Sequence, residues 1–172
     1  MNDTPYHTDI PPPSPSTVQG SNTLFPVFLK LDQFNTLLVG GGTNGLKKLT
    51  ALLRNSPAAR VTLVAPEICP EILTLAQNHN AVSVLTRSFA ASDLNNHQIV
   101  ICATDNHDLD REIANLAHEA GILVNVSDTP DLCDFYLSSI VQKGDLKVAI
   151  STDGRSPTVA KRLKETLHEA LP

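Results

Sequence analysis

The chain has 172 residues, enough for one domain with a hydrophobic core, or for one domain with a small appendage. A net charge of -5, an aromatic content of 4% and the absence of tryptophan argue against a nucleic-acid partner. Three cysteines at wide spacing form neither a disulfide framework nor a zinc-ligand pattern, which favours a reducing, cytoplasmic setting. We find no signal-peptide pattern and no apolar run of membrane-spanning length, so we expect no membrane association.

Residues 1–22 are rich in Pro, Ser, Thr and Asn. Such a segment cannot bury enough apolar surface to offset the entropy that is lost on ordering, so we expect a disordered tail. The apolar stretch LFPVFLKL at residues 24–31 follows, and we expect it to begin the ordered domain and to pack beside the first strand.

The next part of the chain alternates between two apolar patterns. Short apolar runs predict strands at 36–40, 60–64, 81–86, 98–103 and 122–126. Helical spacing of apolar residues predicts helices at 43–55, 67–78 and 106–120. Strands that alternate with helices are typical of an α/β fold with a parallel sheet. We therefore expect residues 23–133 to form a doubly wound, Rossmann-like sheet.

The pattern changes after Asp134. Residues 135–142 and 147–151 are predicted to be two strands joined by a turn, and a helix is predicted to begin at Ser156 and Pro157. An isolated hairpin is only marginally stable in water. Residues 134–172 are therefore interpreted as an appendage, a β-hairpin plus a helix, that needs a partner surface on its own domain or on a second subunit.

A glycine-rich loop joins the first predicted strand to the first predicted helix. Gly40, Gly42 and Gly45 fit the G-x-G-x-x-G pattern, in which bare backbone and a helix start receive a pyrophosphate. The acidic residue that usually ends the second strand is replaced by Ala65 and Pro66. No arginine lies near that position to bind a 2′-phosphate. The sequence therefore predicts a dinucleotide site and favours NAD over NADP.

Polar residues follow the fourth and fifth predicted strands, and ligands of such sheets bind at the carboxyl ends of strands. Asp105 follows the fourth strand and could act as a general base, or else Thr104 or Asp105 could simply cap the next helix. Asn125 and Asp128 lie at the end of the fifth strand. The acidic run from Asp128 to residue 134 could equally be a solvated loop.

The C-terminal part of the chain is basic. Residues 1–140 carry 7 Lys/Arg against 14 Asp/Glu, whereas residues 141–172 carry 6 against 4. The loop Ser151–Pro157 contains Gly154 and leads into a helix start, with Arg162 nearby, so it could bind an anion. Plain helix capping by Ser156 explains the same residues.

From residue 24 onward, the chain resembles the precorrin-2 dehydrogenase / sirohydrochlorin ferrochelatase family, the N-terminal module of siroheme synthases. The resemblance rests on an ordered set of motifs: FPVFL at 25–29, GGG at 40–42, VTLVAPE at 61–67, ATD at 103–105, LVNV at 123–126 with Asp128, and STDGRSP at 151–157. Each motif is weak alone, but the ordered set is specific.

The resemblance implies a chemistry for these residues. Members of the family oxidise precorrin-2 with NAD to sirohydrochlorin, and some also insert ferrous iron to give siroheme. Asp105 is then the catalytic residue. The expected cofactor-binding residues are Gly40, Gly41, Gly42, Thr43, Asn44, Gly45, Ala65, Pro66 and Thr104. The expected residues for the carboxylate-rich tetrapyrrole are Asn125, Asp128, Ser151, Gly154, Ser156 and Arg162. No metal ligands are expected, and family members are homodimers.

The sequence also departs from the family pattern. TNGLKK at 43–48 stands where the family has a Val-Ala pair followed by Arg-Lys. Family members continue beyond the equivalent of Pro172 into helices that help to enclose the tetrapyrrole. A non-catalytic tetrapyrrole carrier or NAD-binding sensor of the same fold is therefore the alternative reading.

Overall fold

The computed structural model describes residues 22–171. The predicted disordered tail, apart from its last residue, lies outside the described residues. Strands and helices follow one another as β1 (Asn35–Val39), α1 (Thr43–Asn55), β2 (Arg60–Ala65), α2 (Pro70–Gln77), β3 (Val82–Thr86), η1 (Ala91–Leu94), β4 (Ile99–Cys102), α3 (His107–Glu119), β5 (Leu123–Val126), η2 (Pro130–Leu132), β6 (Ser139–Lys143), β7 (Leu146–Ile150) and α4 (Pro157–Ala170), where η1 and η2 are short 3₁₀ turns.

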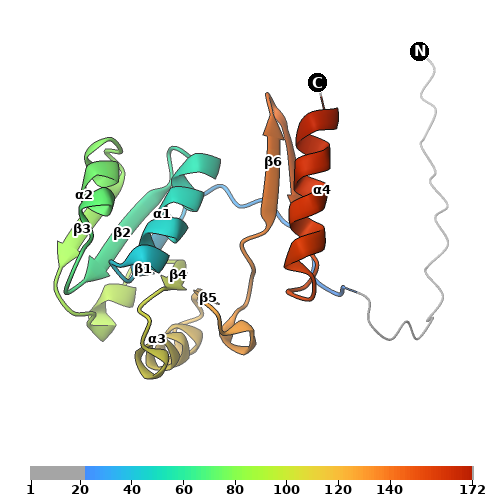
Figure 1. Ribbon diagram of the computed structural model, residues 1–172. Helices are drawn as coiled ribbons and strands as arrows, with labels where there is room; N and C mark the ends of the chain where they lie inside the picture. The colour runs from blue at the N-terminus through green and yellow to red at the C-terminus, as the bar shows by residue number, and fades with distance from the viewer. Residues whose placement is uncertain (1–21, 172) are drawn as a thin grey trace, which may run out of the picture.

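The first five strands form one parallel sheet in the order β3-β2-β1-β4-β5. This is the doubly wound, Rossmann-like architecture that the alternating pattern predicts. Helices α1 and α2 pack on one face of the sheet, where Leu38 of β1 meets Leu49 and Ile72. Helix α3 packs on the other face, where Leu37 and Ile113 share a second core cluster (Figure 1).

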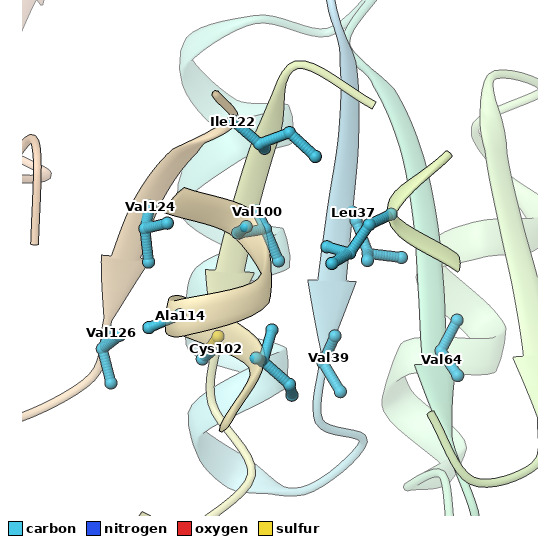
Figure 2. Close-up of a cluster of buried hydrophobic side chains, with 12 residues drawn as sticks. Leu37, Val39, Val64, Val100, Cys102, Ala114, Ile122, Val124 and Val126 are labelled. Atoms are coloured by element: carbon cyan, nitrogen blue, oxygen red, sulfur yellow. The ribbon is translucent and has the colours of Figure 1, made fainter. Parts of the chain in front are cut away.

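The central strands are buried on both faces, as parallel strands covered by helices must be. All four residues of β4 are buried, including Cys102, which is a core residue as its apolar surroundings predict. Parallel pairing places Val39, Val64, Cys102 and Val126 in one row near the carboxyl edge of the sheet (Figure 2). The segments that follow these four residues therefore lie close together in space.

Two predicted boundaries shift. Helix α2 begins at Pro70 rather than at residue 67, because a proline fits the first helical position and the preceding residues form a bend. The first hairpin strand begins at Ser139 rather than at 135, because residues 134–138 cross from the sheet to the hairpin. The remaining elements agree with the prediction to within one or two residues.

The C-terminal unit consists of the antiparallel hairpin β6–β7 and helix α4. Figure 1 shows this unit standing beside the sheet and joined to it by extended chain. Ala160 is buried, whereas Val159 and Leu163 are 55% and 44% exposed. Val159 and Leu163 therefore turn largely away from the hairpin within one chain, whereas Leu167 of the same helix is half-buried.

The apolar stretch at 24–31 forms no regular structure. Leu29 and Leu31 pack against the core beside β1, as predicted. Phe25 and Phe28 do not, since they are 87% and 66% exposed. Within residues 22–171, none of the helices combines the length and apolar character that crossing a bilayer requires.

Candidate functional site

The glycine loop leaves β1 where no side chain fits. A Cβ atom on Gly40 would collide with the backbone oxygen of Ala103, and the residue adopts a φ of +128° that side-chain-bearing residues rarely take. A Cβ on Gly45 would collide with the backbone oxygen of Gly40. The loop therefore lies directly against the end of β4 and the start of α1, as G-x-G-x-x-G predicts.

A cleft of about 560 Å³ opens beside this loop at the carboxyl edge of the sheet. It contains seven of the residues that we predict to hold the cofactor or act on it: Gly40, Gly41, Gly42, Ala65, Pro66, Thr104 and Asp105. The other predicted cofactor residues, Thr43, Asn44 and Gly45, form the adjoining first turn of α1. Glu67, which the site prediction omitted, also lines the cleft, and Lys and Arg are absent from its described lining.

The cleft fits a dinucleotide. Gly42 occupies the N-cap position of α1 and provides no side-chain cap, so the first N–H groups of the helix remain available to an anion. The backbone at Gly40 and Gly41 is bare, and a Cβ at either position would strike backbone atoms. These two clashes are with the protein's own backbone, so the glycines let the loop pack tightly. Beside Gly42, an added Cβ would meet only Oδ2 of Asp105, at 3.8 Å, so a pyrophosphate could approach the main chain there.

Asp105 lies in the cleft with its backbone in the left-handed region, at a φ of +58°. Its Oδ1 atom accepts a hydrogen bond of 2.6 Å from Nδ2 of Asn44, so α1 holds the carboxylate. Asp105 does not cap α3, and neither does Thr104. The cap is Asn106, whose Oδ1 accepts hydrogen bonds from the N–H groups of Asp108 and Leu109. The capping alternative is therefore wrong, and the Asp105 carboxylate is left to face the cleft.

Thr104 is fixed by a buried carboxylate. Its Oγ1 donates a 2.7 Å hydrogen bond to Oδ1 of Asp110, which is 3% exposed. Burial raises the pKa of Asp110, and the hydrogen bonds from Thr104 oppose that rise. This contact holds the turn that carries Asp105. It could not be found from sequence, because Asp110 there looks like an ordinary residue in a helical first turn.

A second cavity, of about 540 Å³, lies between the end of β5 and the hairpin–helix unit. Four predicted substrate residues line it: Asn125, Asp128, Ser151 and Gly154. Ser156 and Arg162 lie outside its lining. Ser156 does occupy the N-cap position of α4, but its side chain makes no capping hydrogen bond. The structure thus brings four of the six predicted residues together at one cavity, from segments that are distant along the chain.

Lys48 also lines this cavity, and our site prediction did not include it. Its Nζ donates a 3.1 Å hydrogen bond to Oδ1 of Asn125, and burial lowers its pKa. Its spacing in the sequence could have identified it, because Lys48 comes four residues after Asn44 and therefore lies on the same face of α1. One helix face therefore contacts Asp105 through Asn44 and Asn125 through Lys48.

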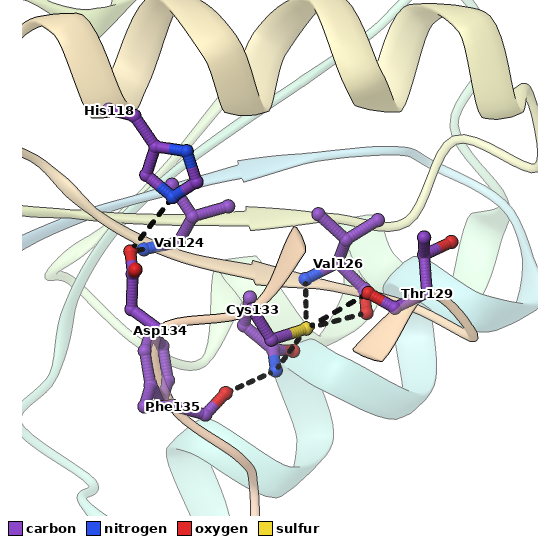
Figure 3. A network of polar contacts seen from close by, with 8 residues as sticks. His118, Val124, Val126, Thr129, Cys133, Asp134 and Phe135 are labelled. Carbon is purple, nitrogen blue, oxygen red and sulfur yellow. Dashed lines mark hydrogen bonds and ion pairs between the residues drawn. The ribbon is translucent and has the colours of Figure 1, made fainter. Parts of the chain in front are cut away.

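The acidic run after β5 is more than a solvated loop. Oδ2 of Asp134 accepts hydrogen bonds from the N–H of Val124 at 2.8 Å and from Nε2 of His118 at 3.1 Å. Sγ of Cys133 accepts a hydrogen bond from the N–H of Val126 (Figure 3). For Asp134, the interpretation as part of a solvated loop is therefore wrong, because this residue accepts a hydrogen bond from a backbone N–H of the edge strand β5. Asp128 remains exposed at the cavity.

Within residues 22–171, no three His, Cys, Asp or Glu side chains gather where they could hold a metal ion. The described part of the chain thus supplies carboxylates, amides, hydroxyls and lysines around two cavities. These groups can bind anions and move protons.

Comparison with known families gives two matches. The family model described as "Putative NAD(P)-binding" matches residues 27–139, and the model described as "Sirohaem biosynthesis protein central" matches residues 143–170. Curated relatives include a siroheme synthase of Thioalkalivibrio sulfidiphilus, 40% identical over 86% of this chain and 30% of that protein. A siroheme synthase of Pseudoalteromonas translucida is 39% identical, with the same coverage of 86% and 30%. The chain therefore spans under a third of the length of these relatives.

A solved structure has the same arrangement. The protein described as "SirC, precorrin-2 dehydrogenase" superposes with a TM-score of 0.68 and is 27% identical. The match covers 85% of this chain and 70% of that chain, so it includes the sheet and reaches into the C-terminal unit.

Proposed function

The chain belongs to the NAD(P)-binding family whose model matches residues 27–139, and from this premise we propose that it oxidises precorrin-2 to sirohydrochlorin with NAD. One observation carries the proposal: the Asp105 carboxylate lies in the same cleft as the bare glycine loop. Relatives named siroheme synthase and the similarity to a precorrin-2 dehydrogenase support this substrate.

Gly40, Gly41, Gly42 and the start of α1 would hold the pyrophosphate of the cofactor. Bound nicotinamide supplies a hydride acceptor. The preference for NAD over NADP is supported by Glu67, because a 2′-phosphate would meet a carboxylate, and the described lining of the cleft offers no Lys or Arg to pair with it.

Oxidation of precorrin-2 removes a hydride and a proton from the macrocycle. Asp105 takes the proton and passes it to solvent, to which its side chain is exposed. Asn44 holds one carboxylate oxygen, which leaves the other, Oδ2, for the substrate. That oxygen lies 3.8 Å from where a Cβ on Gly42 would be, so it faces the glycine loop.

The tetrapyrrole would extend from Asp105 in the cleft into the second cavity, where Asn125, Asp128, Ser151 and Gly154 supply polar contacts. We further propose a homodimer, because Val159 and Leu163 leave an apolar strip of α4 exposed. In the dimer, Ser156 and Arg162 remain candidate contacts for substrate carboxylates. Light scattering of the purified protein should give twice the mass of the chain.

Ferrous iron is proposed as a second substrate, inserted into sirohydrochlorin bound in the same position beside Asp105. The macrocycle would supply the nitrogen ligands, and Asp105 would help to remove the pyrrole protons. We place both reactions in the cytoplasm, where the three free cysteines would stay reduced.

The test is an anaerobic assay with precorrin-2 in excess over protein and with either NAD or NADP. We expect repeated turnover, with a higher kcat/KM for NAD. Asp105→Ala should abolish turnover and still bind NAD. If the protein binds both NAD and sirohydrochlorin but forms no NADH, it is a carrier or sensor and the dehydrogenase proposal is wrong.

A further inference from the structure

Lys48 is a cation at the wall of the second cavity that the proposed reaction has not used. It lies on α1 and is half-buried, while its neighbour Lys47 is exposed and lines a separate groove between α1 and the hairpin–helix unit. Two adjacent lysines therefore have different surroundings. Of the two, only Lys48 reaches the cavity that Asn125 and Asp128 line.

The contact between Lys48 and Asn125 has a fixed direction. Nδ2 of Asn125 donates a 2.8 Å hydrogen bond to the backbone oxygen of Phe135, so Oδ1 is the atom that accepts from Lys48. Asn125 is 3% exposed and is held by β5. The Asn125 amide therefore orients the Lys48 ammonium group, because the amide cannot turn over without losing its buried hydrogen bond to Phe135.

The ammonium group is only partly satisfied by the protein. It has three donors, and among residues 22–171 only Asn125 accepts from it. No ion pair to Lys48 occurs within the described chain, although Cys133 and Asp128 lie near enough to raise its pKa against the larger effect of burial. A half-buried cation with unused donors is stabilised by an anion that enters the cavity.

We propose that Lys48 binds a carboxylate of the tetrapyrrole, with Asn125 orienting the ammonium group. This inference rests on the proposed function. Lys161 and Ser151 line the same cavity from the C-terminal unit, so donors from both units surround one space. A macrocycle with carboxylates on its rim fits that arrangement better than a neutral ligand does.

The test compares Lys48→Met with Lys47→Met, which removes the same charge one residue away. Sirohydrochlorin is titrated into each protein and followed by absorbance, with NAD affinity measured in parallel. We expect Lys48→Met to weaken sirohydrochlorin binding by about 10- to 100-fold, the range for one charged hydrogen bond. Lys47→Met should bind as the wild type does, and Lys48→Arg should recover part of the loss. NAD affinity should be unchanged in all three.

Thermal unfolding separates this role from a purely structural one. If Lys48 binds substrate, Lys48→Met should weaken sirohydrochlorin binding whatever its effect on Tm, because loss of the half-buried cation and loss of the donor to Oδ1 of Asn125 act on stability in opposite directions. A lower Tm with unchanged sirohydrochlorin affinity would mean that Lys48 only ties α1 to β5, and would overturn the inference.

The outcomes also separate this inference from the proposed function. Suppose that the wild type turns over precorrin-2 and that Lys48→Met binds sirohydrochlorin as tightly as the wild type does. The proposed function then stands, and only the role of Lys48 is refuted. Wild-type protein that does not bind sirohydrochlorin refutes both.

Discussion

Asp105 and Asp128 adopt the same backbone conformation at equivalent places, directly beyond the ends of neighbouring strands. Their φ values are +58° and +59°, in a region that aspartate tolerates better than most residues. Each turns its carboxylate into a different cavity. Sequence could place both residues at strand ends, but it could not show that α1 reaches over to hold one of them.

The hydrogen bond from Asn44 to Asp105 gives the first prediction. Asn44→Val should lower kcat by about tenfold, the equivalent of one charge-assisted hydrogen bond, because the carboxylate can then rotate away. The KM for NAD should change little. Thr50→Val, at an exposed position of α1, is the control. Steady-state kinetics in which both variants match the wild type would show that Asn44 does not position Asp105.

Asp110 gives a prediction about pH. Burial raises its pKa in the folded protein, so at neutral pH its charge opposes folding, and this penalty fades as pH falls through the raised pKa. Asp110→Asn keeps an acceptor for Thr104 and removes the charge. Its Tm should exceed that of the wild type at pH 8, where the wild-type carboxylate is charged.

Melting curves between pH 8 and pH 4 check this prediction. The advantage of Asp110→Asn should shrink as pH falls, because the wild-type carboxyl then becomes neutral as well. A constant difference across the range would mean that charge burial is not the cause.

At the scale of elements, most of the fold could be predicted because each strand and helix carries its own periodicity. Helix α1 begins and ends where its glycine loop and leucine spacing predict. The cap of α3 was misassigned because Thr104, Asp105 and Asn106 are all capping residues, and only the backbone decides between them. The role of Asp134 was missed because its partner Val124 is separated from it by a loop.

The edge strand β5 pairs with the side chain and the backbone N–H of Asp134 instead of with another strand. Asp134 accepts the N–H of Val124, and its own N–H donates to the backbone oxygen of Val124 at 2.8 Å. An edge strand with unpaired N–H groups is exposed to pairing with other chains. The segment that leads to the hairpin thus protects the sheet and fixes where the C-terminal unit begins.

Asp134→Ala should lower the free energy of unfolding by about 1–3 kcal/mol, because the N–H of Val124 loses its acceptor. Amide exchange at Val124 should speed up in the same variant. Asp131→Ala, in the same acidic run but in neither of these two hydrogen bonds, is the control and should unfold like the wild type. Equal stabilities for the two variants would contradict the edge-protecting role.

At the scale of the whole molecule, α1 connects the two cavities. Its first turn borders the dinucleotide cleft and contacts Asp105, and its next turn brings Lys48 to the cavity beside the C-terminal unit. The sequence indicates polar residues beside both cavities, but it could not show their connection, because the hydrogen bonds of Asn44 and Lys48 join residues 61 and 77 positions apart in the chain. Cofactor and substrate would thus be aligned by a single rigid helix.

The most direct measurement is the stoichiometry of NADH to sirohydrochlorin under anaerobic conditions, with the protein present in catalytic amounts. We predict one NADH for each sirohydrochlorin over many turnovers, and none with Asp105→Ala. Sirohydrochlorin that accumulates without NADH would contradict hydride transfer to the cofactor, and an unchanged rate with Asp105→Ala would contradict the role of Asp105 as the proton acceptor.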